Sequence, residues 1–84
     1  MFLVYVLKSA VASKSYVGLT DDLQRRIHEH NSGKHFYTRR HKPWVVIYKE
    51  QFDTFADAKD REKYFKSTSG RRFLKKVFDC TNIK

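Results

Sequence analysis

Hydrophobic residues gather first in three short continuous runs. Residues 2–7 are rich in β-branched and aromatic side chains, which predicts a central strand buried on both faces of a sheet. Residues 15–19 predict a second strand, and the brief connection between the two runs predicts an antiparallel hairpin. Residues 44–48 follow Pro43, which is tolerated at the start of a strand, and predict a third strand. The pattern therefore predicts a small three-stranded antiparallel sheet.

The segment after the hairpin has helical spacing and carries two polar side chains beside its apolar stripe. At 100° per residue, Leu23 and Ile27 define the stripe, and Arg26 and His30 lie next to it. The pattern therefore predicts that a cation and an imidazole are held toward the body of the protein.

The ends of this helix are also marked. Thr20 and Asp21 open it, and Asp21 has capping-box spacing to Gln24. Residues 31–33 contain the Asn and Gly that commonly end helices.

Two further helices are predicted after the third strand. Thr54 caps one that runs to about residue 66, and residues 67–70 break it. Residues 71–78 form a last short helix, whose apolar face consists of Phe73, Leu74, Val77 and Phe78. The predicted order is β-β-α-β-α-α, an α+β fold in which helices flank the sheet. At 84 residues we expect a single domain over residues 1–84.

The second helix places a carboxylate among apolar positions. On the helical wheel, Glu62 falls within the stripe of Phe55, Ala58 and Phe65. A buried carboxylate costs free energy unless it is paired or binds a cation. Two explanations stay open: an ion pair with Arg26 or a neighbouring lysine, or a metal-binding or catalytic role.

The charge of the chain favours a polyanionic partner. Eighteen Lys and Arg against nine Asp and Glu give a formal net charge of +9, and residues 30–49 and 63–78 contain no acid. Such clusters are typical of nucleic-acid binding. Phe36 and Tyr37, inside the first cluster, are candidates for stacking on an exposed base. The candidate phosphate contacts are Lys34, Arg39, Arg40, Lys42, Lys66, Arg71 and Arg72.

Cysteine usage and hydropathy suggest where the protein works. The single cysteine, Cys80, cannot form an internal disulfide, so we expect a reducing, cytoplasmic setting. The apolar run at residues 2–7 is too short for a signal peptide or a membrane span, so we expect no membrane contact.

Four segments in this order and spacing resemble the GIY-YIG nuclease domain, most closely its short single-domain bacterial members. Residues 3–5 and 16–18 stand for the two family triplets, residues 22–31 resemble the arginine-bearing helix, and residues 61–66 resemble the glutamate segment. The resemblance covers nearly the whole chain. Leu3 replaces the glycine of the first triplet, but the tyrosine that carries the chemistry is retained.

The resemblance implies hydrolysis of DNA phosphodiester bonds with one divalent ion, Mg²⁺ or Mn²⁺. Glu62 would bind the metal, and Arg26 would steady the charged phosphoryl group. Tyr5, Tyr16 and His30 would position or deprotonate the attacking water, and the choice of base among them stays open. A tyrosine base requires that Arg26 or the metal lower the phenol pKa from its usual value near ~10.

Two further residues complete the predicted site. The resemblance implies a basic or histidine residue after the first helix, for which we favour His35 over Lys34 and His41 as a nucleic-acid contact. Gly18 permits close backbone approach at the end of its strand, because it has no Cβ.

The resemblance also implies a setting in DNA repair or recombination, with junctions or flaps as candidate targets. Family members gain target choice from appended domains, so three alternatives stay open here: a protein partner for target selection, poor selectivity, or recognition of structure instead of sequence. The main rival is a module that keeps the fold and binds nucleic acid without cleaving it. A purely structural or protein-interaction domain would leave the net charge and Glu62 unexplained.

Overall fold

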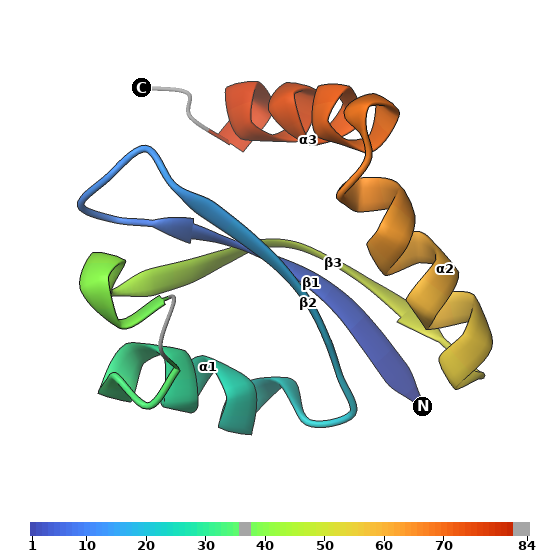
Figure 1. The fold of residues 1–84 in the computed structure, drawn as a ribbon, viewed down its shortest axis with the longest axis horizontal. Helices are drawn as coiled ribbons and strands as arrows, with labels where there is room; N and C mark the ends of the chain where they lie inside the picture. The colour runs from blue at the N-terminus through green and yellow to red at the C-terminus, as the bar shows by residue number, and fades with distance from the viewer. Residues whose placement is uncertain (36–37, 82–84) are drawn as a thin grey trace.

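The computed structural model describes the backbone of residues 1–35 and 38–81, and side chains as far as residue 77. Phe36 and Tyr37 and the side chain of Phe78 therefore lie outside the described residues. The predicted β-β-α-β-α-α order is confirmed, with one added 3₁₀ helix (Figure 1). The elements are β1 (Phe2–Ser9), β2 (Ser15–Thr20), α1 (Leu23–Ser32), η1 (Thr38–His41), β3 (Trp44–Phe52), α2 (Phe55–Phe65) and α3 (Thr68–Thr81).

The three strands form one antiparallel sheet in the order β2-β1-β3. β1 is the central strand, as its continuous apolar run predicts. Successive side chains of a strand point to opposite faces. Val4 and Val6 therefore face one side of the sheet, and Tyr5 and Leu7 face the other, and all four are completely buried. β2 is an edge strand, so one of its long sides is not covered by another strand.

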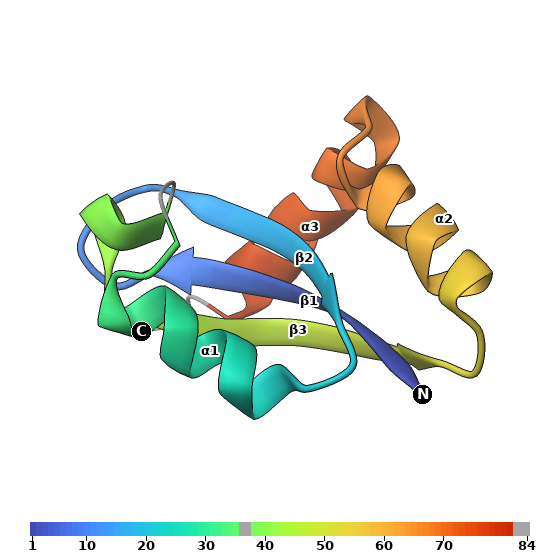
Figure 2. The same ribbon diagram turned by 60° about the horizontal axis from the view of Figure 1, so that its bottom comes forward.

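Helices cover both faces of this sheet. Leu23 and Ile27 of α1 pack on the side that holds Tyr5, Leu7 and Trp44. α2 and α3 lie on the opposite side of the sheet (Figure 2). Their buried residues join those of the sheet in a second apolar cluster of Val4, Val6, Val17, Ala58, Phe65 and Leu74.

The N-terminus of α1 differs from the prediction, whereas its C-terminus agrees. Asp22 is the N-cap, because its carboxylate accepts a hydrogen bond from the Arg25 backbone N–H, so the predicted capping box of Asp21 and Gln24 is wrong. Gly33 ends the helix with φ 89°, a left-handed conformation that favours glycine.

The predicted break before the last helix is present but shorter than expected, because α3 already begins at Thr68. Ser67 acts as a cap instead of a breaker: its Oγ accepts a hydrogen bond from the Gly70 backbone N–H at 3.2 Å. Gly70 then lets α3 cross the end of α2 closely, because a Cβ there would lie 1.9 Å from the Tyr64 carbonyl oxygen. Phe55, expected in the apolar stripe of α2, is 53% exposed at the beginning of that helix.

Candidate active site

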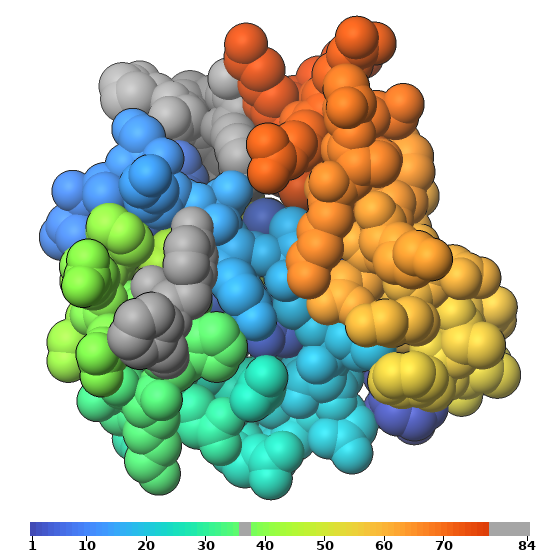
Figure 3. All heavy atoms as spheres, in the orientation of Figure 1, coloured from blue at the N-terminus to red at the C-terminus, as the bar shows by residue number. Residues whose placement is uncertain are grey.

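The side chains predicted to be catalytic come from four elements that meet around the edge strand β2. Tyr5 lies on β1, Tyr16 on β2, Arg26 and His30 on α1, and Glu62 on α2. α1 approaches β2 from one face of the sheet and α2 from the other. Figure 3 shows the light-blue surface of β2 between α1 and α2. The strand edge is therefore the place where both layers can contribute to one site.

Tyr5 is completely buried directly beneath Gly18, its antiparallel partner on β2. A Cβ at position 18 would lie 2.3 Å from the Tyr5 hydroxyl oxygen, so only glycine leaves room for the phenol. The hydroxyl forms a 3.1 Å hydrogen bond with His30 Nε2. The backbone of β2 thus fixes Tyr5 against α1.

The second ring nitrogen of His30, Nδ1, is also hydrogen-bonded. It lies 2.7 Å from the Thr38 hydroxyl oxygen, and the Thr38 carbonyl accepts a hydrogen bond from Trp44 Nε1 at 2.7 Å. His30 is 1% exposed and Thr38 is completely buried. Sequence reasoning missed Thr38, because a threonine in a basic loop has no periodic or motif signal.

The donors around Tyr5 assign the tautomer of His30. The Arg26 guanidinium near Tyr5 has only donors, so His30 Nε2 is the acceptor that the structure shows for the buried phenol hydroxyl. The phenol proton is then directed at His30 Nε2, which accepts it. His30 Nδ1 consequently carries the imidazole hydrogen and donates to the Thr38 hydroxyl.

Burial sets the protonation states of this pair. It lowers the pKa of His30 to about 4, with the charges of His35 and Arg26 acting in the same direction. Burial and the neighbouring Tyr16 raise the pKa of Tyr5 to about 12, although Arg26 acts in the opposite direction. The condition for a tyrosine base, a phenol pKa below its usual value, is therefore not met at Tyr5 by Arg26 alone. At neutral pH, Tyr5 is a protonated phenol and His30 is a neutral imidazole.

Tyr16 and His35 extend this cluster toward the surface. The Tyr16 hydroxyl lies 3.4 Å from His35 Nε2. The ring centroid of His30 lies 4.9 Å from that of Tyr16 and 4.7 Å from that of His35. His35 Nδ1 is buried and has no hydrogen-bond partner among the residues that the structure describes. His35 is thus next to Tyr16 and His30 rather than on the open part of its loop.

Arg26 pairs with a residue of its own helix. Its Nη1 lies 3.1 Å from Glu29 Oε1, and its side chain is 33% exposed. The guanidinium therefore bridges the buried Tyr5 and solvent, where it can meet a phosphate.

Glu62 is only 8% exposed, which agrees with its place in the apolar stripe. Lys59 Nζ and Lys66 Nζ each lie 3.2 Å from one of its two carboxylate oxygens. The alternative of a pair with a neighbouring lysine is therefore realised, and a pair with Arg26 is not. The charge of Glu62 also raises the pKa of Tyr5, which is consistent with both residues facing one region near β2.

The donor set decides which metal sites are feasible. Among residues 1–35 and 38–77, no three His, Cys, Asp or Glu side chains cluster in a way that could hold a metal. Mg²⁺, however, is commonly bound through one or two carboxylates, substrate phosphates and several waters. Glu62 fits that pattern, because the lysines that pair with it are more than half exposed and are free to move away.

The predicted phosphate contacts lie on both sides of β2. One group surrounds η1 and is exposed: Lys34, Arg39, Arg40 and Lys42. The other lies at the junction of α2 and α3 and is also exposed: Lys66, Arg71 and Arg72. In Figure 3, the segment around η1 and the α2–α3 junction flank the surface of β2.

Comparison with known proteins assigns this arrangement to a class. The model of the GIY-YIG catalytic domain matches residues 1–76, so the chain belongs to the GIY-YIG family, a family of nucleases. The resemblance seen in the sequence is therefore confirmed.

No helix in the described part of the chain is long and apolar enough to cross a membrane.

Similar relatives within this family are UPF0213 proteins. The one from Bacillus pumilus is 44% identical over 69 residues, which cover 81% of this chain and 69% of the relative. UPF0213 protein HQ_3675A from Haloquadratum walsbyi is 40% identical over 81 residues, 95% of this chain and 90% of the relative. The solution NMR structure of UPF0213 protein BH0048 from Bacillus halodurans superposes with a TM-score of 0.55 at 31% identity, covering 92% of this chain and 85% of that one.

Proposed function

We propose that this protein is a metal-dependent endonuclease that hydrolyses DNA phosphodiester bonds. The observation that carries the proposal is the hydrogen bond between Tyr5 and His30 beside β2, with Arg26 near it on α1 and the carboxylate of Glu62 on α2. Phosphodiester hydrolysis needs an activated water, stabilisation of negative charge and help for the leaving oxygen. Membership of a nuclease family supports the reaction class.

Arg26 is suited to the phosphoryl group. Its guanidinium can donate two parallel hydrogen bonds to phosphate oxygens, which a lysine cannot do. Its charge acts on Tyr5, so this cation lies beside the group that would handle the water.

Tyr5 and His30 together can take the proton of the attacking water. The Tyr5 oxygen is completely buried in the free protein, so it must become accessible to the attacking water when substrate binds. As the water O–H bond breaks, its proton would then pass to this oxygen, and the phenol proton to His30 Nε2. The resulting hydroxide attacks phosphorus, and the bond to the leaving oxygen breaks. This relay requires no free phenolate, which the raised pKa of Tyr5 disfavours. Tyr16, whose ring lies against His30, helps to position the water.

Glu62 would hold one Mg²⁺ or Mn²⁺ together with the substrate phosphate. The bound ion would neutralise the charge that develops on the leaving oxygen. Because Lys59 and Lys66 occupy both carboxylate oxygens, their side chains must give way for this role.

The proposal is tested with branched, flapped, nicked and single-stranded DNA in the presence of Mg²⁺ or Mn²⁺. We expect cleavage by the wild type and a loss of roughly 10²–10³-fold in rate for Glu62→Gln and for Arg26→Ala. Lys63→Ala, an exposed change next to Glu62, is the control and should cleave normally. Full cleavage by Glu62→Gln, or cleavage that persists with a chelator, would overturn the proposal. Comparing the DNA forms also tests selection by structure, as expected of a repair or recombination enzyme.

A second candidate function is a nucleic-acid-binding module without catalysis. The two lysine contacts favour it, because they satisfy the buried carboxylate of Glu62 without any metal. This function predicts that the wild type binds DNA in a salt-dependent way and cleaves none of the substrates at any Mg²⁺ or Mn²⁺ concentration. A requirement for a protein partner in target selection would appear as cleavage that is unselective among these forms.

A further inference from the structure

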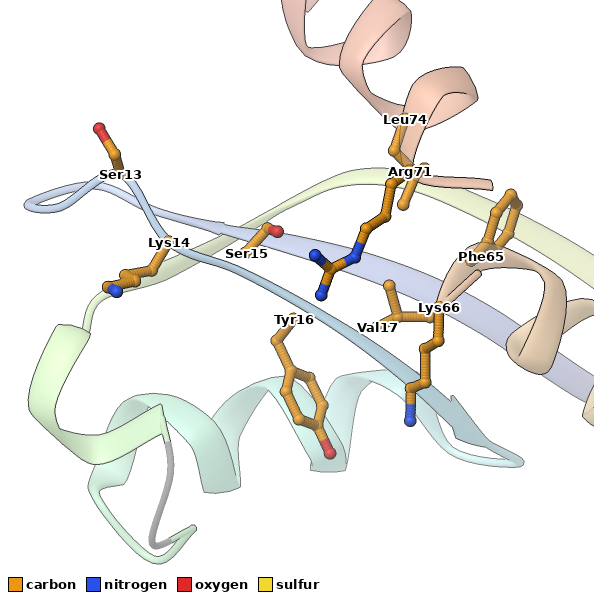
Figure 4. A pocket seen from close by; sticks show the side chains of 9 residues that line it. All are labelled: Ser13, Lys14, Ser15, Tyr16, Val17, Phe65, Lys66, Arg71 and Leu74. Carbon is orange, nitrogen blue, oxygen red and sulfur yellow. The ribbon is translucent and has the colours of Figure 1, made fainter. Parts of the chain in front are cut away.

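A groove of about 710 Å³ lies between β2 and the junction of α2 and α3. Its floor is apolar and consists of Val17, Phe65 and Leu74 (Figure 4). Lys66 and Arg71 extend into it from the helices, and Figure 4 shows the Arg71 side chain directed toward β2. The groove is thus apolar at the bottom and cationic at the rim.

The lining indicates the chemistry of an occupant. Lys14, Lys66 and Arg71 bring three cations to the rim, and no acidic residue among the described side chains of residues 1–35 and 38–77 lines the groove. The volume is within the range of ~300–1,000 Å³ typical of small-ligand sites. An occupant that matches these features has an apolar, flat part for the floor and at least one negative charge for the rim. A nucleotide has both.

The groove is continuous with the candidate active site. Tyr16 lines the groove and also lies against the rings of His30 and His35. Lys66 lines the groove and also contacts Glu62. A strand that places its phosphate at Arg26 and Glu62 would therefore extend naturally into the groove along β2.

We propose that the groove binds one nucleotide of the substrate strand next to the phosphate that is cleaved. The base lies over the floor of Val17, Phe65 and Leu74, and the phosphate meets Lys66 and Arg71. This subsite rests on the proposed function, because it assumes that the bound polyanion is a nucleic acid strand. A base that enters the groove cannot be paired, so the subsite selects strands with an unpaired nucleotide at this position over continuous duplex.

Binding is measured by fluorescence anisotropy in a chelator, so that the result does not depend on cleavage. The probes are a short oligothymidylate, an abasic oligomer with the same number of phosphates, and a continuous duplex. For the wild type we expect the oligothymidylate to bind roughly tenfold more tightly than the abasic oligomer, as is typical of one base held in a protein site.

Two variants test the groove itself. Ser15→Ile narrows the groove without changing the charge, because Ser15 is exposed on β2 and lines it. We expect it to abolish the preference for bases and to retain binding of the abasic oligomer. Its control is Gln51→Ile, an exposed position on β3 that does not line the groove. The preference should be unchanged in this control.

Arg71→Ala should weaken binding of both single strands roughly tenfold and lower the salt dependence by about one phosphate contact. Lys75→Ala, an exposed charge on α3 outside the groove, is its control. Equal affinity of the wild type for the abasic oligomer and oligothymidylate, or Ser15→Ile behaving like Gln51→Ile, would overturn the subsite. Cleavage by the wild type with Mg²⁺ would still be expected in that case, because the proposed nuclease function does not depend on the subsite. Conversely, a base preference without any cleavage would support the nucleotide subsite and contradict the proposed nuclease function.

Discussion

The hydrogen bond between Tyr5 and His30 joins two buried side chains whose protonation states are set by their surroundings. A tyrosine base would need the charge of Arg26, or a bound metal, to lower the phenol pKa, and the sequence left the choice of base open among Tyr5, Tyr16 and His30. Burial of Tyr5 outweighs that charge and raises the pKa to about 12. Burial lowers the pKa of His30 to about 4, so the imidazole is uncharged and available to accept a proton at neutral pH. The pair, and not either residue alone, is suited to act on water.

The lowered pKa of His30 predicts acid sensitivity. The unfolded imidazole titrates near 6.5 and the folded one near 4, so the unfolded chain binds more protons between these values. The contribution of neutral His30 to the free energy of unfolding is complete above pH ~6.5 and is lost as the pH falls toward 4. Between pH 7 and pH 5 we expect the free energy of unfolding to fall by about 2 kcal/mol from this residue alone.

Urea denaturation at several pH values measures this effect. His30→Gln should remove most of the decrease between pH 7 and pH 5, although the variant is less stable at pH 7. His28→Gln, on the exposed side of the same helix, should keep the wild-type profile. A pH dependence unchanged by His30→Gln would contradict the assignment.

Gly18 permits the contact between β2 and Tyr5, and this leads to a second prediction. In Gly18→Ala, the new Cβ would lie 2.3 Å from the Tyr5 hydroxyl oxygen, so the phenol must move away from His30. We expect a loss of about 1–3 kcal/mol in the free energy of unfolding, as is typical of overpacking, and at least a tenfold loss of any cleavage rate. Val11→Ala, a 67% exposed position in the β1–β2 connection that does not line the groove, should change neither quantity. A fully active Gly18→Ala protein would be inconsistent with this role of the glycine.

At the level of elements, the junction of α2 and α3 determines where Glu62, Lys66 and Arg71 lie relative to β2. The two helices join with almost no loop, because Ser67 caps α3 directly after α2 ends. The approach is close enough that position 70 has no room for a side chain. The junction therefore fixes one wall of the groove and one side of the candidate site.

Gly70→Ala tests the importance of this junction. A Cβ there would lie 1.9 Å from the Tyr64 carbonyl oxygen, and this backbone atom cannot move without shifting a helix. Although alanine favours helices over glycine by about 1 kcal/mol, we expect net destabilisation of about 2 kcal/mol and a melting temperature lower by ~10 °C. Ser69→Ala, its exposed neighbour, should be neutral or slightly stabilising. Thermal unfolding followed by circular dichroism distinguishes the two, and an increase in stability for Gly70→Ala would contradict the observed packing.

At the scale of the whole molecule, the candidate site lies on a strand edge between two helical layers. Tyr5 and His30 come from the layer of α1, whereas Glu62 comes from the layer of α2 on the other face of the sheet. The exposed cations around η1 and at the α2–α3 junction flank the same strand. Exposed cations that contribute to the net charge of +9 thus lie on both sides of the candidate site.

This charge arrangement predicts a strong salt dependence of DNA binding. Each phosphate that is neutralised contributes about −0.9 to the slope of log K against log salt concentration for duplex DNA. We expect affinity to fall steeply between 50 and 200 mM salt (~10³-fold for six contacts). Arg40→Ala, in the group around η1, should reduce the slope by about one, and Lys49→Ala on β3 should leave it unchanged. An affinity that does not vary with salt would exclude phosphate contacts as the source of binding.

The order of elements, the central position of β1 and the burial of Glu62 followed from the sequence alone. Each depends on a local pattern: an apolar run for β1, helical spacing for α1 and α2, and one carboxylate inside an apolar stripe. The start of α3 could not be predicted in this way. Ser, Thr and Gly are weak helix formers, and both the Ser67 cap and the close contact of Gly70 with α2 are visible only in the folded structure.

Tertiary structure decided the chemistry of the candidate site. The sequence named Tyr5, Arg26 and His30, but it contained no sign that Thr38 holds His30 or that burial outweighs Arg26 at Tyr5. It also left open whether Glu62 pairs with Arg26 or with a lysine. Such outcomes depend on distances between residues far apart in the chain and on how deeply each group is buried. Composition and periodicity specify which side chains turn inward, whereas the packed fold specifies which partners they meet there.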